Sequence, residues 1–218
     1  MHKNLQELLK SCEQLAASKN YSQILDKLRF YSKYDILYNA ELPNLESHLQ
    51  MKPMYSIHIA ESQNYNATCF GFLKKYGNIP LHDHSDMHGF LKILQGTIQL
   101  TTYSYLQPNE EKDVRATSSS EFSKNDEYVP VKCEGSKIIT CEDHMNTVTY
   151  LSPFQGNIHS IEALEDNTAF FDLLYPGYCG RKAQYFENTP DNNKEHGQLT
   201  WLKKCEAPEY LDMSAFKL

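Results

Sequence analysis

The stretch that decides the fold runs from Ile79 to Gly96 and reads IPLHDHSDMHGFLKILQG. It begins with two histidines one residue apart, His82 and His84, and ends with an apolar run that leads into a glycine. Because side chains alternate between the two faces of a β-strand, we expect both imidazoles on one face and Asp83 on the other. This spacing predicts half of a metal site, with two unrelated strand histidines as the alternative.

The residues around this stretch predict further strands. Pro80 fits the start of a strand, residues 90–94 form the next apolar run, and the turn at Gly96 leads into alternating residues 97–106. Additional β-rich runs are found at residues 55–60, 68–75, 136–140 and 147–151, a turn within residues 152–163 leads into another strand, and residues 168–178 contain an apolar strand. The pattern therefore predicts a mainly β domain.

Other parts of the chain have a different character. Apolar residues at helical spacing predict two short amphipathic helices before residue 33, packed on the outside of the β domain: Leu5, Leu8, Leu9, Cys12, Leu15 and Ala16, then Tyr21, Ile24, Leu25, Leu28 and Tyr31. Residues 34–53 are polar and irregular, and residues 107–127 read as a charged, solvated loop.

Composition favours one intracellular domain. The 218 residues are 40% hydrophobic, which suits a single domain over 1–218, with a helical N-terminal extension at 1–33 and the β domain and C-terminal segment at 54–211. A net charge of −7 argues against nucleic-acid binding, and no signal-peptide pattern or membrane-spanning run is present. Six irregularly spaced cysteines favour a reduced compartment, which we take as the cytoplasm, with the nucleus as an alternative.

The histidine stretch resembles the metal motif of the thiol dioxygenases, a branch of the cupin superfamily that contains cysteine dioxygenase and cysteamine (2-aminoethanethiol) dioxygenase. Ordinary cupins carry a glutamate ligand a few residues after the second histidine, but residues 85–90 contain none. The resemblance therefore implies a site of three histidines. The fold it implies is all-β, a cupin (double-stranded β-helix) barrel with the short N-terminal α-helices packed outside.

The third ligand is implied by residues 152–163, where a Gly-Asn turn precedes His159, as in the second cupin motif. His144 is the competitor, in a polar loop. His88 has the same strand parity as His84, but the family motif does not use it as a ligand. We interpret His88 as a packing residue or as a residue behind the ligands.

The block after the third histidine resembles the cysteamine dioxygenase and plant cysteine oxidase branch. That resemblance assigns Asp172 and Tyr178 to substrate positioning and places Tyr185 near the metal. A structural role for Asp172 as a hydrogen-bond acceptor is the alternative. The chain departs from the family at Ala183 and Gly89, where relatives carry the cysteine of a Cys-Tyr crosslink, so neither crosslink is expected.

The resemblance also implies the chemistry. Three neutral imidazoles suit Fe(2+) and leave open positions for a thiolate and O2, so that both oxygen atoms are added to sulfur to give a sulfinic acid. Free-cysteine dioxygenases clamp the substrate carboxylate with an arginine in the strand corresponding to residues 55–58, which has none here. Cysteamine, or the N-terminal cysteine of a peptide or protein, is therefore the expected substrate. For a protein substrate, the family's role is oxygen sensing through the N-degron pathway, and a monomer is expected.

Three alternatives remain open from the sequence. The first is a cupin module that binds a metal without catalysis. The second is a free-cysteine dioxygenase, in which Arg181 would supply the missing guanidinium. The third is a cupin enzyme that uses Ni or Mn, although Mn usually prefers a carboxylate ligand.

Overall fold

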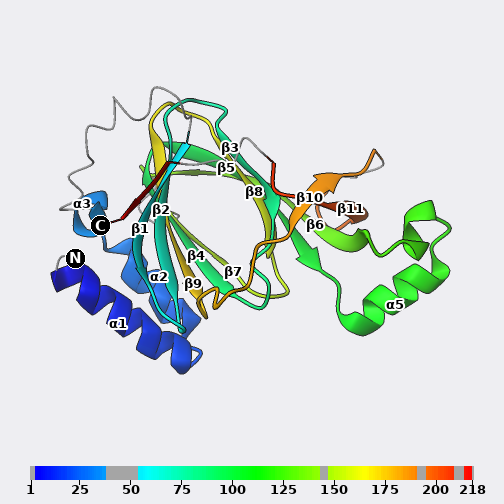
Figure 1. The fold of residues 1–218 in the computed structure, drawn as a ribbon, viewed down its shortest axis with the longest axis horizontal. Coiled ribbons are helices and arrows are strands. Elements are labelled where there is room, and N and C mark those ends of the chain that lie inside the picture. The colour runs from blue at the N-terminus through cyan, green and yellow to red at the C-terminus, as the bar shows by residue number, and fades with distance from the viewer. Residues whose placement is uncertain (1–2, 38–53, 143–146, 191–194, 209–213, 218) are drawn as a thin grey trace.

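The computed structural model describes residues 3–37, 54–142, 147–190, 195–208 and 214–217. Two sheets curve around a common interior, and short helices lie outside them (Figure 1). The first sheet has the order β12 (Ser214–Lys217), β1 (Met54–Glu61), β2 (Asn66–Phe72), β9 (Thr168–Tyr175), β4 (His88–Gln95) and β7 (Val148–Leu151). These strands pair antiparallel, except for the parallel pair of β12 and β1.

The second sheet closes on itself. Its order is β10 (Tyr185–Asn188), β11 (Leu199–Cys205), β6 (Tyr128–Thr140), β5 (Thr97–Tyr105), β8 (Ile158–Ala163) and β3 (Asn78–His82). Pairing of Tyr185 with His82 joins β10 to β3. The arrangement confirms the predicted all-β cupin barrel with N-terminal helices outside.

The helices α1 (Lys3–Ala17) and α2 (Tyr21–Arg29) lie against the outer face of the first sheet (Figure 1). Their apolar stripes bury Leu8, Cys12 and Leu28 against residues of the sheet such as Phe171 and Leu173. This confirms the two predicted amphipathic helices, since burial of one apolar face is what the 3.6-residue period provides. No helix in the described part of the chain is long and apolar enough to span a membrane.

A short helix, α3 (Lys33–Leu37), begins the segment that the sequence indicated to be irregular. This expectation was wrong for the first residues of the segment, because Asp35 accepts hydrogen bonds from the backbone and hydroxyl of Ser32 at the start of the helix. Residues 38–53 lie outside the described residues.

The interior between the sheets is apolar at one end. It includes Ile93, Leu100 and Phe170, whose side chains point inward from β4, β5 and β9. In the middle of β3, Pro80 interrupts the pairing with β8, and the register shifts between Ile79 and His82. Pro80 therefore lies within the strand, not at its start as predicted, and the missing N–H explains the break in the ladder.

Residues 107–127 do not form the predicted loop. They contain the helix α5 (Pro108–Thr117) and the 3₁₀ helix η1 (Glu121–Lys124). Proline opens α5, acidic residues lie in its first turn and Arg115 lies in its last turn, all of which favour a helix. The sequence pattern missed α5 because none of its residues is buried, so the helix has no apolar stripe.

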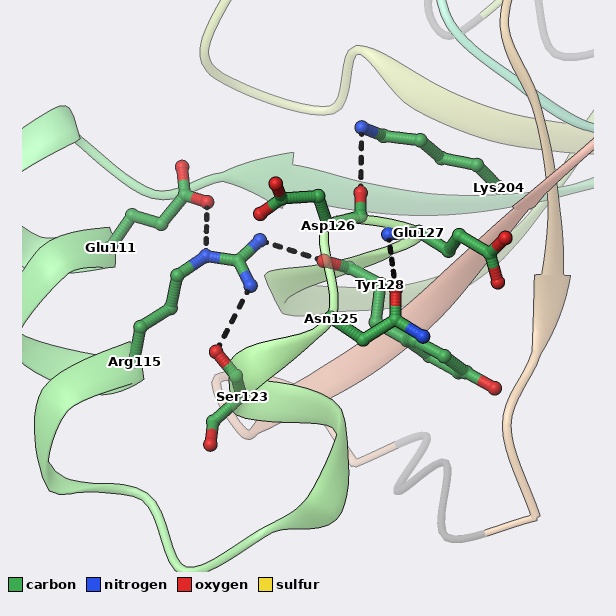
Figure 2. Close-up of polar contacts among 8 residues, drawn as sticks. All are labelled: Glu111, Arg115, Ser123, Asn125, Asp126, Glu127, Tyr128 and Lys204. Carbon is green, nitrogen blue, oxygen red and sulfur yellow. Dashed lines mark hydrogen bonds and ion pairs between the residues drawn. The ribbon is translucent and has the colours of Figure 1, made fainter.

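Arg115 holds residues 107–127, called the arm below, against the barrel, as Figure 2 shows. Its guanidinium pairs with Glu111 at 2.8 Å and donates to the backbone carbonyl groups of Tyr128 at 2.7 Å and Ser123 at 3.4 Å. The same group lies over the ring of Trp201 in β11. Arg115 is thus one anchor of the arm, which extends away from the helices α1 and α2 (Figure 1).

Candidate metal centre

Three buried histidines converge between the two sheets. The possible ligand atoms of His82, His84 and His159 all lie within 4.8 Å of one another. The ring centroids are 4.9 Å apart for His82 and His84, 4.4 Å for His82 and His159, and 5.1 Å for His84 and His159. The structure therefore brings together the three residues that the sequence proposed as ligands.

Hydrogen bonds orient each ring. The Nδ1 of His82 donates to the carbonyl group of Pro80 at 2.8 Å, and the Nδ1 of His159 donates to the carbonyl group of Asn157 at 2.9 Å. The Nδ1 of His84 lies 2.8 Å from the hydroxyl of Tyr178. Because a carbonyl oxygen can only accept, Nδ1 carries the proton in His82 and His159, and Nε2 keeps its lone pair for a metal.

Burial keeps these imidazoles neutral. Desolvation lowers the pKa of His82 and, more strongly, the pKa of His84. It lowers the pKa of His159 to about 3, and the neighbouring His82 adds to the effect. A neutral imidazole is the form that binds a metal, so at neutral pH the three histidines can bind a metal ion without first losing a proton.

The elements that carry the ligands differ in one detail from the prediction. His82 ends β3 and His159 lies in β8, where the two residues pair directly. His84 follows the end of β3, so the expectation that both members of the His-x-His pair lie in a strand was wrong for His84. The chain holds His84 in place through tertiary hydrogen bonds.

The two other histidines considered from the sequence fall elsewhere. His88 lies on the outer face of the first sheet, where its ring stacks on Tyr21 at 4.1 Å and its Nδ1 contacts the hydroxyl of Tyr150 at 2.7 Å. Its interpretation as a packing residue is confirmed. His144 lies outside the described residues.

Asn157 holds the loop that carries His84. Its side chain is fully buried, accepts from the backbone N–H of His84 at 2.9 Å and donates to the carbonyl groups of His84 and Ser152. The sequence identified Asn157 only as a turn residue before His159. Its position close to His159 was the available sign of a role at the metal site. The hydrogen bonds themselves could not be predicted, because their partner His84 is distant in the sequence.

We expect Asn157→Ala to destabilise the fold by about 2–4 kcal/mol, because several buried backbone groups lose their partner at once. Metal affinity is expected to fall by about 10–100-fold, as for other residues that orient ligands. Urea unfolding and metal analysis of the purified variant measure the two effects. Wild-type stability together with wild-type metal content would show that Asn157 has no such role.

Asp83 stabilises the other side of the histidine pair. Its carboxylate accepts from the hydroxyl of Tyr105 and from the backbone N–H of Gln184, both at 2.8 Å. The carboxylate thus points away from the metal ligands, as the strand parity predicted. It connects the end of β3 to β5 and to the segment before β10.

A cavity of about 190 Å³ opens beside the three histidines. Apolar residues from both sheets form much of its wall, among them Phe70, Leu91, Ile161 and Phe170. Asp172 is the only carboxylate among the described residues that line it, and no lysine or arginine lines it. The cavity therefore suits a small, partly apolar molecule with a cationic group.

Asp172 lies on the inner face of β9. Burial raises the pKa of its carboxyl group to about 7, and the backbone N–H of Leu173 opposes this only in part. A strongly raised pKa marks Asp172 as a candidate functional group. A nearby cation would lower this pKa and convert the carboxyl group to the carboxylate.

Tyr178 and Tyr185 also line the cavity. Besides facing the cavity, Tyr178 contacts the Nδ1 of His84, a role that the sequence did not indicate. Tyr185 begins β10 and its ring lies 5.9 Å from that of His82. Burial raises the pKa of both phenols, so both hydroxyl groups stay protonated at neutral pH. Ala183 lines the same wall and has no sulfur to offer Tyr185.

Comparisons with known proteins agree with this geometry. The family model described as PCO_ADO matches residues 19–217. The 2-aminoethanethiol dioxygenase of Homo sapiens is 29% identical over 147 residues, which cover 62% of this chain and 53% of that protein. Plant cysteine oxidase 1 of Arabidopsis thaliana is 28% identical over 141 residues, 63% of this chain and 43% of that protein. The chain thus spans about half the length of the curated relatives it matches.

Solved structures that resemble the chain include a cupin superfamily protein from Desulfitobacterium hafniense. It has a TM-score of 0.35 and 13% sequence identity, and the match covers 56% of this chain and 76% of that one.

Proposed function

The chain belongs to the PCO_ADO family, whose model matches residues 19–217, and from this premise we propose that it is a thiol dioxygenase. Family membership confirms the resemblance inferred from the sequence. The observation that carries the proposal is a cluster of three buried, neutral imidazoles at a cavity with one carboxylate. His82, His84 and His159 are the proposed metal ligands, and Asp172, Tyr178 and Tyr185 are the proposed active-site residues.

The donor set fits Fe(2+). It consists of three imidazole nitrogens without a carboxylate or thiolate, and imidazole is a common ligand of iron in proteins. The chemistry supplied by bound Fe(2+) would be transfer of both atoms of O2 to the thiol sulfur, which gives a sulfinic acid. Thiol and O2 balance this product, so no further reductant is needed.

The chain's own residues position the substrate. Asp172 binds the ammonium group next to the thiol, because its carboxylate is the only one at the cavity among the described residues. The hydroxyl group of Tyr178 orients the ring of His84 by contacting the Nδ1 of that histidine. The apolar cavity wall around Phe170 excludes water. Tyr185 contributes a protonated hydroxyl group on the side of His82.

The same cavity favours a thiol without a free carboxylate. Arg181, the one arginine near the metal centre among the described residues, donates to the backbone carbonyl groups of Gly177, Tyr178 and Ser85 and does not line the cavity. The described residues that line the cavity would therefore offer no cationic side chain to the carboxylate of free cysteine. Cysteamine and the N-terminal cysteine of a peptide or protein both present an amine beside the thiol and no carboxylate at that position.

The cellular setting is also a proposal. All six cysteines are unpaired in the structure, which supports a reduced compartment such as the cytoplasm. A monomer with O2 and a thiol as its partners is sufficient for the reaction. Action on protein N-termini would make the enzyme an oxygen sensor.

The test is to incubate iron-loaded protein with cysteamine, free cysteine or a short peptide that begins with cysteine, under ¹⁸O-labelled O2. Mass spectrometry is expected to find two labelled oxygen atoms in cysteamine or in the peptide, and at most slow labelling of free cysteine. A peptide that begins with serine is the control. If iron is bound and no thiol gains oxygen, the protein is a non-catalytic metal-binding module instead.

A further inference from the structure

Asn66 lines the cavity at the metal centre and is neither a proposed metal ligand nor a proposed catalytic residue. It begins β2, directly after the turn from β1, where residues 62–64 are exposed. Phe70, an inward residue near the other end of β2, stacks on Phe170 in the apolar part of the interior, with ring centroids 5.3 Å apart. Asn66 therefore lies at the solvent side of the cavity, and Phe70 lies at its apolar end.

The side-chain amide of Asn66 has an unused donor. Its Oδ1 accepts a hydrogen bond from the hydroxyl of Thr68 at 3.1 Å, which leaves the Nδ2 group to donate elsewhere. Within the described part of the chain this Nδ2 makes no hydrogen bond, and it is not among the buried side-chain atoms that lack a partner. The donor thus keeps accessible surface at the cavity, where a ligand can reach it.

Asn66 is a near neighbour of Asp172 across the first sheet. Thr68 lies opposite Asp172, and Asn66 lies opposite Leu174, two residues further along β9. Such diagonal neighbours on one face of an antiparallel pair are about 7–8 Å apart and can contact one small molecule together. The amide donor therefore lies within one small molecule's length of the carboxylate, on the side toward solvent.

The two candidate substrates differ at the position that this donor can reach. With the ammonium group at Asp172 and the sulfur toward the histidines, the carbon that bears the amine is held beside Asp172. In an N-terminal cysteine this carbon also carries the carbonyl group of the first peptide bond, through which the rest of the chain leaves the cavity. In cysteamine it carries hydrogen instead. A carbonyl oxygen can only accept a hydrogen bond, so it matches the free N–H of Asn66.

We propose that Asn66 is a specificity-determining residue, whose Nδ2 donates to the carbonyl oxygen of the first residue of an N-terminal cysteine substrate and so favours that substrate over cysteamine. The inference rests on the proposed thiol dioxygenase function and deepens it. A neutral amide group does not offset the cost of burying the free carboxylate of cysteine, so the contact suits a peptide carbonyl.

The test compares cysteamine with L-cysteinamide, which is cysteamine with one carboxamide group added to the carbon that bears the amine. The values of kcat/KM are measured for both thiols with iron-loaded wild type and with Asn66→Leu, which keeps the approximate size of the side chain and removes the donor. The ratio of kcat/KM for L-cysteinamide to kcat/KM for cysteamine is expected to fall by about 3–10-fold in the variant, through loss of one neutral hydrogen bond. A short peptide that begins with cysteine should behave like L-cysteinamide.

Two further variants separate this role from a structural one. Thr68→Val removes the hydroxyl that holds Oδ1 and should shift the same ratio in the same direction by a smaller factor. Asn64→Ala is the matched control, because Asn64 belongs to the same turn but donates to Glu13 of α1, at 2.7 Å, and does not line the metal-centre cavity. Asn64→Ala should keep the wild-type ratio.

An unchanged ratio in Asn66→Leu, or an equal fall in Asn64→Ala, would overturn the role of Asn66 and leave the thiol dioxygenase assignment intact. If iron-loaded wild type oxidises neither thiol, the proposed function is wrong and the role of Asn66 is overturned with it.

Discussion

Replacing His159 with alanine is expected to empty the metal centre and abolish thiol oxidation, while the barrel stays folded. His159 supplies one of three converging imidazoles, and two ligands from one short segment bind iron weakly. Loss of residues that merely orient a ligand costs about 10–100-fold in metal affinity, so loss of the ligand itself should cost more than about 100-fold. Metal analysis, circular dichroism and mass spectrometry of the thiol product measure the three properties.

His88→Ala is the matched control for this experiment. His88 belongs to the same histidine-rich stretch but stacks on Tyr21 outside the sheet. We expect this variant to keep its iron and its activity and to lose some thermal stability. If His159→Ala retained stoichiometric iron, or if His88→Ala lost it, the assignment of the ligands would be wrong.

Replacing Asp172 with asparagine is expected to reduce activity in a manner that depends on pH. Burial raises the pKa of the Asp172 carboxyl group to about 7 when no cation is near, and bound iron lowers it, so in the iron-loaded enzyme the carboxylate that pairs with the substrate amine forms below pH 7. The ratio of kcat/KM between wild type and Asp172→Asn should therefore rise about tenfold per pH unit while the carboxyl group is protonated and level off once the carboxylate has formed, at a pH below 7. Titration of the substrate cancels in this ratio.

The same substitution should have the opposite effect on stability. Burial raises the pKa of Asp172 in the folded protein above its ordinary value of 3.8, so the folded state holds this proton more tightly than the unfolded state does. The stability contributed by the protonated form is complete below about pH 4 and is lost as the pH rises through 7. Asp172→Asn should therefore be more stable than wild type at pH 8, by on the order of 4 kcal/mol at most, and the difference should fade toward pH 4.

A second carboxylate provides the control. Asp166 is exposed, and the backbone N–H of Lys75 and the nearby lysines lower its pKa. Asp166→Asn should leave kcat/KM at wild-type values throughout the pH range and should not stabilise the protein. If Asp172→Asn gave a ratio that does not vary with pH and a stability equal to wild type, Asp172 would have neither the raised pKa nor the proposed role.

Local patterns predicted much of the fold. Alternation in segments such as residues 97–105 predicted strands, because one face of a sheet is buried and the other is not. The helical period predicted α1 and α2 for the corresponding reason. The same method failed at α5, because this helix buries no residue and is held by Arg115 through Tyr128 and Ser123, which follow it in the chain.

The candidate site was predicted unevenly. His82, His84 and His159 were identified from two motifs and their spacing, and Asp172 stood out as a charge within an apolar strand. The hydrogen bonds of Asn157 were not predicted, because amide partners leave no periodic signal in a sequence.

The sequence by itself predicted the ligand types and, for His82 and His159, the strands that carry them, because each prediction depends on neighbours within a few residues. The tertiary structure alone decided that the ring centroids of His159 and His84 lie 5.1 Å apart and that Tyr178 contacts the Nδ1 of His84. These features depend on strands that are distant in the chain and meet only when both sheets close around the shared interior, where burial sets the hydrogen bonds and the pKa values.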